Sequence, residues 1–196
     1  MLVYSSERRH WAMGDVTDLL RRARDTDHAA IDEVVALVYP ELRRMARAKL
    51  ASNDTITLLD TTSMVHEVYL KLHHAARIDA DSRGQFMAYA AQAMRSVIVD
   101  YARKRRAERR GGGVADVTLA TAILDGSPST DDDIERVDEA LKELEKTDPR
   151  LKQVVEMRFF GGLTEQEIAE ALDVTERTVR RDWERARMLL SVALRP

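Results

Sequence analysis

The stretch from Leu163 to Leu190 constrains the fold most, because it contains two helix starts with only a tight turn between them. Thr164 occupies an N-cap position, and Glu167 three residues later completes a capping box. Thr175 is a second N-cap candidate, at the start of the next helix. Asp173 lies in the turn, where glycine is common, and aspartate also tolerates the left-handed conformation. The pattern predicts a short helix, a turn and a longer helix.

The longer helix has two different faces. Its apolar side chains recur at steps of three and four residues, so we expect them to be buried: Val179, Trp183, Ala186, Leu190 and Ala193. The residues placed to contact DNA lie at its start and along its basic side: Thr175, Arg177, Thr178, Arg180, Arg181 and Arg185. This layout is typical of a helix-turn-helix that reads the major groove. The alternative is an ordinary helical hairpin with a solvated charged face.

The composition favours helices over a turn-rich β fold, because 196 residues include only 8 glycines and 4 prolines. The net charge of −3 means that the chain as a whole lacks the excess of positive charge that would by itself indicate a nucleic-acid partner. The absence of cysteine excludes disulfides and thiolate metal sites. No apolar run has membrane-spanning length and no signal peptide is evident. We therefore expect an all-α, soluble protein of the cytoplasm.

The first part of the chain predicts a helical domain over residues 14–110. Residues 1–13 are expected to be a disordered tail, with Met13 as the true translation start as the alternative. Pro40 interrupts the apolar pattern of the domain's second helix, so a kink or local break is expected near Val38. A long helix is expected from Gly84 to Arg110. Its last eight residues contain six bases and one acid, more than a helix C-terminus needs. This strip is typical of a surface that tracks phosphates.

The middle of the chain separates two domains. Three consecutive glycines end the long helix, and residues 111–131 have the weak periodicity of a flexible linker. From Gly111 to Lys146 there are ten acids and three bases, so the linker region is acidic. Residues 132–196 are then expected to form a four-helix domain that ends in the helix-turn-helix.

Other kinds of site find little support. His66 and His73 are seven residues apart, and no carboxylate beside them or His74 completes a known metal-binding spacing. The sequence has no glycine-rich phosphate loop, no paired catalytic carboxylates and no recognisable Ser/His/Asp set. We therefore expect no catalytic residues, no metal and no cofactor.

Four segments, in this order, resemble the bacterial RNA polymerase sigma factors of the extracytoplasmic-function (ECF) type. They read LVYPELRRMARAKL, TTSMVHEVYLKL, FMAYAAQAMRSVIVDYARKRRAERR and LTEQEIAEALDVTERTVRRDWERARMLL. The resemblance implies two domains. The first would bind core RNA polymerase and the −10 promoter element, and the second would bind the −35 element.

The resemblance also implies roles for individual residues. Those facing the polymerase clamp would be His66, Glu67 and Lys71. Those at the −10 strand would be Arg95, Ser96, Asp100, Arg103 and Lys104. The family pattern usually has asparagine where this chain has Ser96, which puts the base preference there in doubt.

The implied partners are core RNA polymerase and promoter DNA, and an anti-sigma factor is a further partner that the resemblance allows. One rival is a conventional repressor or activator that uses the same helix-turn-helix, but it leaves the basic strip unexplained. Another is a helical enzyme such as a phosphohydrolase. Only a sigma factor is expected to bind core polymerase tightly.

Overall fold

The computed structural model describes residues 13–24, 28–51, 60–75, 78–108 and 131–194, and this part of the chain is all-helical. Its elements, in chain order, are α1 (Met13–Arg24), α2 (His28–Ala51), α3 (Thr61–His73), α4 (Arg83–Glu108), α6 (Asp131–Thr147), α7 (Pro149–Val155), the π-helical turn η3 (Glu156–Phe160), α8 (Glu165–Leu172) and α9 (Glu176–Ala193). The expected all-α fold is confirmed. The expected tail over residues 1–12 and nearly all of the expected linker lie outside the described residues.

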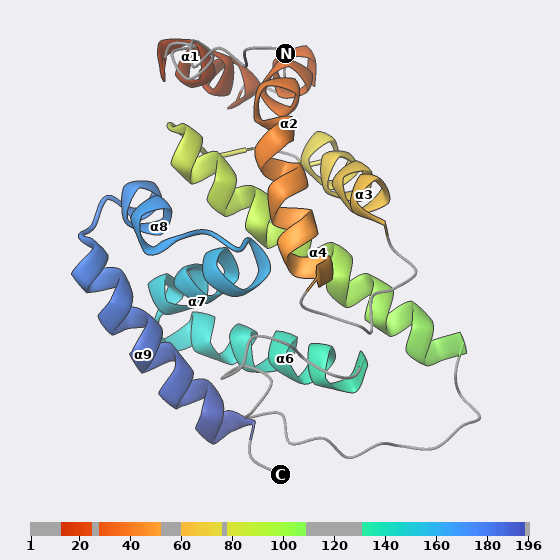
Figure 1. The fold of residues 1–196 in the computed structure, drawn as a ribbon, viewed down its shortest axis with the longest axis vertical. Coiled ribbons are helices and arrows are strands. Elements are labelled where there is room, and N and C mark those ends of the chain that lie inside the picture. Colours follow the sequence, from red (N-terminus) through yellow and green to blue (C-terminus); the bar gives the residue numbers. More distant parts are fainter. Residues whose placement is uncertain (1–12, 25–27, 52–59, 76–77, 109–130, 195–196) are drawn as a thin grey trace, which may run out of the picture.

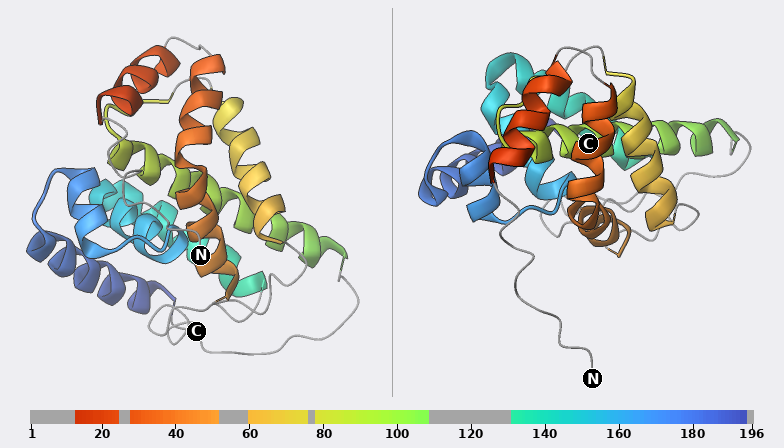
Figure 2. Two further views of the ribbon diagram at one scale, coloured as in Figure 1. Left: turned by 45° about the horizontal axis from the view of Figure 1, so that its top comes forward. Right: turned by 90° about the horizontal axis from the view of Figure 1, so that it is seen from above.

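Helix α4 runs through the middle of the molecule, with α1, α2 and α3 on one side and α6 to α9 on the other (Figures 1 and 2). We call α1 to α4 the N-terminal group and α6 to α9 the C-terminal group. The side chains of Phe86, Met94 and Ile98 are almost completely buried. Helix α4 is therefore a core element of its own group and also the surface on which the other group packs.

Helix α2 continues without a break through Pro40. Of the kink or local break expected near Val38, the break is therefore absent. Val34, Val38 and Leu42 on either side of the proline are all buried, so packing of this apolar face compensates for the hydrogen bond that proline cannot donate.

The local signals of the helix-turn-helix are confirmed. The Thr164 hydroxyl accepts a hydrogen bond from the Glu167 backbone N–H, and the Glu167 carboxylate accepts one from the Thr164 N–H. Asp173 ends α8 in the left-handed conformation, with φ 52°. In the stripe of α9, Ala193 is exposed and Leu194, the next residue, is buried instead. The helix ends at Ala193, so the helical period no longer decides which side chain faces the core.

The backbones of the two groups come into close contact at small residues. A Cβ atom added to Gly84 at the start of α4 would lie 2.9 Å from the Cα atom of Ala171 in α8. A Cβ atom on Gly161 would lie 2.9 Å from the Cβ atom of Ala91 in α4. Real Cβ atoms do not come this close to backbone, so Gly84 is required for the observed contact between α4 and α8.

Lys49 at the end of α2 is buried against the C-terminal group, with its Nζ atom 3.4 Å from the centre of the Phe159 ring. Burial lowers its pKa from 10.5 to about 7, because the charged form loses its hydration. The face of the ring attracts the ammonium form and opposes this shift.

This burial predicts a stability that depends on pH. Between pH 7 and 10.5 the unfolded chain keeps the Lys49 proton that the folded chain has released. The free energy of unfolding should therefore rise with pH in this window, by at most about 1.4 kcal/mol per pH unit from this group. Urea unfolding at several pH values should show a shallower rise for Lys49→Met than for the wild type. Equal slopes would mean that Lys49 is charged in the folded state.

Candidate nucleic-acid interface

The start of α9 is organised by its two threonines. The Thr175 hydroxyl accepts a hydrogen bond of 3.2 Å from the Thr178 backbone N–H, and the two hydroxyls lie 3.0 Å apart. Helix α9 packs on α6, α7 and α8 at the edge of the molecule (Figure 1). The outer face of α9 is therefore accessible at its N-terminal end, which is the end that a recognition helix places in the major groove.

The predicted arginines of α9 fall into two sets. Arg177 and Arg181 are exposed, Arg181 with 71% of its side chain, and the carboxylate nearest to Arg181 is Asp182 at 3.6 Å. Arg180 donates two hydrogen bonds to Glu165 of α8, and Arg185 donates one to the N-cap residue of α7. Arg180 and Arg185 must leave hydrogen-bonded carboxylates to reach DNA, whereas Arg181 has only the longer ion pair with Asp182 to break.

Glu165 links the two helices of the helix-turn-helix. It accepts hydrogen bonds from Arg180 at 2.7 Å and from Arg158 at 2.9 Å. These bonds hold the pKa of Glu165 below its usual value. The Arg158 guanidinium also lies 4.7 Å from the centre of the Trp183 ring. These contacts help to hold α9 at a defined angle to α8.

Asp182 is a residue of this site that the sequence reasoning did not single out. Its side chain is almost completely buried and accepts a hydrogen bond of 2.8 Å from Arg150 of α7. The side chain lies one position before Trp183, on the buried stripe, so the helical spacing could have indicated it. It anchors α9 to α7.

The residues predicted for the −10 strand lie on α4, and Arg95 is the most deeply placed. It is buried between two carboxylates of the C-terminal group: its Nη1 lies 3.3 Å from Asp138 and its Nε 3.1 Å from Glu156. Neither contact has hydrogen-bond geometry at these arginine atoms. Burial raises the pKa of Glu156, although the charges of Arg95 and Lys152 oppose the shift.

The other predicted −10 residues are more accessible. Ser96 is half-buried, while Asp100, Arg103 and Lys104 are exposed. Arg103 nevertheless donates a hydrogen bond of 3.1 Å to Asp138, and Arg106 donates one of 2.8 Å to Glu135. Part of the predicted strip thus already contacts acids of α6. Arg109 and Arg110, which complete the strip, lie outside the described residues.

The residues predicted to face polymerase lie on α3. Asp60 caps this helix by accepting hydrogen bonds from the backbone N–H groups of Thr62 and Ser63. His66 and Glu67 are exposed, whereas Lys71 is half-buried and forms an ion pair of 2.8 Å with Asp100. Lys71 and Asp100, assigned to different partners, are therefore adjacent.

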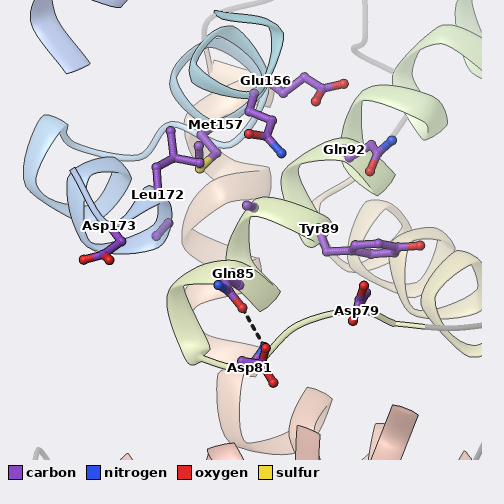
Figure 3. A pocket seen from close by; sticks show the side chains of 12 residues that line it. Asp79, Asp81, Gln85, Tyr89, Gln92, Glu156, Met157, Leu172 and Asp173 are labelled. Atoms are coloured by element: carbon purple, nitrogen blue, oxygen red, sulfur yellow. Dashed lines mark hydrogen bonds between the residues drawn. The ribbon is translucent and has the colours of Figure 1, made fainter. Parts of the chain in front are cut away.

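A cavity of about 480 Å³ lies where the two groups meet. Asp79, Gln85 and Tyr89 line it from the side of α4, and Glu156 and Asp173 line it from the C-terminal group (Figure 3). Within the described residues, no group of three or more histidines and carboxylates could hold a metal ion. None of the described helices is long and apolar enough to cross a membrane.

Residues 13–196 match the model of a family described as ECF sigma factor. The chain is 27% identical over 173 residues to the ECF RNA polymerase sigma factor SigK of Mycobacterium tuberculosis strain H37Rv, covering 85% of this chain and 86% of that protein. SigK of Mycobacterium ulcerans strain Agy99 is 27% identical over 176 residues, with the same coverage of both chains. No solved structure gives a significant match.

Proposed function

Because the chain belongs to the ECF sigma factor family, we propose that it binds core RNA polymerase and directs it to specific promoters, where transcription begins. The observation that supports this best is the outer face of α9, where Arg177 and Arg181 are exposed. The helix itself is held in place by its N-cap, by ion pairs and by its buried stripe of apolar side chains. A rigid helix with exposed donors at its start is what base reading in the major groove requires.

We assign the two promoter elements to the two parts of the chain. Residues 14–110 would bind core polymerase and the −10 element, residues 111–131 would form the linker, and residues 132–196 would bind the −35 element. Two DNA-binding domains of low affinity that are joined by a linker bind more tightly together, because binding of the first raises the effective concentration of the second at its promoter element. The −35 contacts would come from Thr175, Thr178 and the arginines of α9, and the −10 contacts from Arg95, Ser96, Asp100, Arg103 and Lys104.

His66, Glu67 and Lys71 would provide the polymerase contact on α3. Reversing the charge of Glu67 with Glu67→Lys should weaken binding to core polymerase at least about tenfold, since the opposite charge then replaces a carboxylate that contacts the partner. Glu67 is exposed, so the fold should be unchanged. Fluorescence anisotropy with purified core polymerase measures the affinity. The matched control is Glu143→Lys, which reverses the charge of an exposed residue of α6. Equal affinities for wild type and Glu67→Lys would remove α3 from the interface.

The proposal gives the protein no catalytic step, and its action on polymerase and promoter DNA places it in the cytoplasm. An anti-sigma factor would be a further partner. The experiment that separates a sigma factor from a conventional repressor or activator is capture of core polymerase by the tagged chain. A sigma factor captures core polymerase in the absence of DNA. A conventional repressor or activator does not need core polymerase and is not expected to capture it.

A further inference from the structure

The accessible end of α9 carries an acid as well as arginines. Glu176 is the first residue of the helix, directly after the N-cap Thr175, and it is exposed. No residue that the structure describes forms a hydrogen bond or an ion pair with its side chain. When a recognition helix enters the major groove, a carboxylate at this end meets the negative charge of DNA. Such a carboxylate weakens binding unless it is bonded to a base.

The neighbouring acids, in contrast, have partners within the protein. Glu165 accepts hydrogen bonds from Arg180, and the buried Asp182 accepts one from α7. Glu184, two turns further along α9, accepts a long hydrogen bond from within its own helix. The pKa of Arg180 is raised mainly by its hydrogen bond to Glu165, and the charge of Glu176 adds little to this shift. The contacts within the fold therefore leave the Glu176 carboxylate available for a partner.

We propose that Glu176 determines sequence specificity, because its carboxylate accepts a hydrogen bond from the amino group of a cytosine in the −35 element. The inference rests on the proposed function, since it takes α9 to be the helix that reads this element. Cytosine presents its N4 amino donor in the major groove, which suits a group that only accepts. Adenine has an amino donor beside the acceptor N7, which repels the second carboxylate oxygen, and guanine and thymine present acceptors.

This contact excludes wrong sequences more than it strengthens binding to the right one. Opposite a cytosine, the hydrogen bond offsets the water that the carboxylate loses on entering the groove. Opposite another base, the carboxylate is left without a donor and close to the phosphates, which costs binding energy. The exposed Arg177 and Arg181 supply attraction to DNA at the same end of the helix. Attraction and exclusion thus come from adjacent residues.

An acid at this position also has effects inside the helix. Negative charge in the first turn interacts favourably with the helix dipole. Glu176 also precedes Arg180 by four residues, a spacing that favours attraction between a glutamate and an arginine. Neither effect depends on the sequence of the DNA. A measurement of base preference at each position therefore separates these effects from a contact with cytosine.

Three variants isolate the contact. Glu176→Gln keeps the size of the side chain, and its amide can pair with both N6 and N7 of adenine. Preference at one position should then move from cytosine towards adenine. Glu176→Ala removes the acceptor and should leave the same position without a preference. The matched control is Glu184→Gln, which removes the same charge from an exposed residue of the same helix.

Selection from a library of random DNA duplexes gives the base preference at every position. It is carried out by each full chain alone and by each chain with core polymerase. The wild type and Glu184→Gln should prefer cytosine to adenine at one position by about tenfold. Glu176→Gln should lower this ratio at least about tenfold, at that position only. Circular dichroism on each variant verifies that its helices are intact.

Four outcomes would overturn the proposal. They are an unchanged preference in Glu176→Gln, an equal change in Glu184→Gln, a change at a position where the wild type does not prefer cytosine, and a wild type that selects no sequence in either arm. The arm without polymerase keeps the proposed function separate. A chain that selects DNA sequences by itself but does not bind core polymerase would contradict the proposed function and leave the result on Glu176 standing.

Discussion

A chain with both Arg177→Ala and Arg181→Ala is expected to lose specific recognition of its −35 element. If each arginine reads a base, its removal costs about 1–3 kcal/mol, and the two losses together about 2–6 kcal/mol. The reason is geometric: both side chains extend from the exposed face near the start of α9, where a recognition helix contacts base edges. Binding to a duplex carrying the promoter, measured by anisotropy at fixed salt, gives the loss.

The control for this variant must change the charge of the chain by the same amount. Arg21→Ala with Arg22→Ala removes two exposed arginines from α1, far from α9, where they form surface ion pairs with Asp18 and Glu33. Such pairs contribute little to stability. The control should therefore bind promoter DNA nearly as well as the wild type. If both double variants lost the same affinity, α9 would contribute only charge and the reading of bases would lie elsewhere.

Phe160→Ala is expected to be the most destabilising of the single substitutions. The Phe160 side chain is 1% exposed, and its ring packs edge-on against Phe159 with the ring centres 4.8 Å apart. Removing a buried aromatic ring loses its burial and leaves a cavity, at a cost of about 3–5 kcal/mol. Urea unfolding followed by circular dichroism measures the change in the free energy of unfolding.

Val192→Ala provides the comparison, because this residue of α9 is 60% exposed. Its effect should stay within about 0.5 kcal/mol. A loss below about 1 kcal/mol for Phe160→Ala would show that η3 does not pack in the core as described. A large loss would tie the π-helical turn to the stability of the C-terminal group.

The features that the sequence predicted correctly depend on residues close together in the chain. Thr164 and Glu167 form the capping box because they are three residues apart, and Asp173 accepts the left-handed turn because of its own side chain. The all-helical fold follows from the same kind of local periodicity. These signals do not depend on what the rest of the chain does.

The features that were missed depend on residues far apart in sequence. Nothing local to Arg95 shows that Asp138 and Glu156 surround it, because these partners come from helices beyond the linker. The helical period of residues 149–160 predicts one continuous helix, but the structure has a π-helical turn at Glu156–Phe160, closed by a hydrogen bond from the Gly161 N–H to the Glu156 carbonyl. The resemblance supplied the expected −10 residues and gave no indication that α6 covers them.

The contact between α4 and α6 changes how the predicted DNA-binding residues should be understood. Arg95 and Arg103 belong to an ion cluster with Asp138 in the free chain and to the −10 contact in the proposed complex. The same positive charges would thus serve two competing surfaces. Helix α9 differs from α4 in this respect, because its outer arginines, Arg177 and Arg181, are exposed.

Run-off transcription with purified core RNA polymerase over a library of genomic promoters tests the central claim most directly. With the chain added, core polymerase should initiate at discrete positions preceded by a shared pair of −35 and −10 elements, and Arg177→Ala with Arg181→Ala should lose these transcripts. If core polymerase with the chain initiates no differently from core polymerase alone, the chain does not act as a sigma factor.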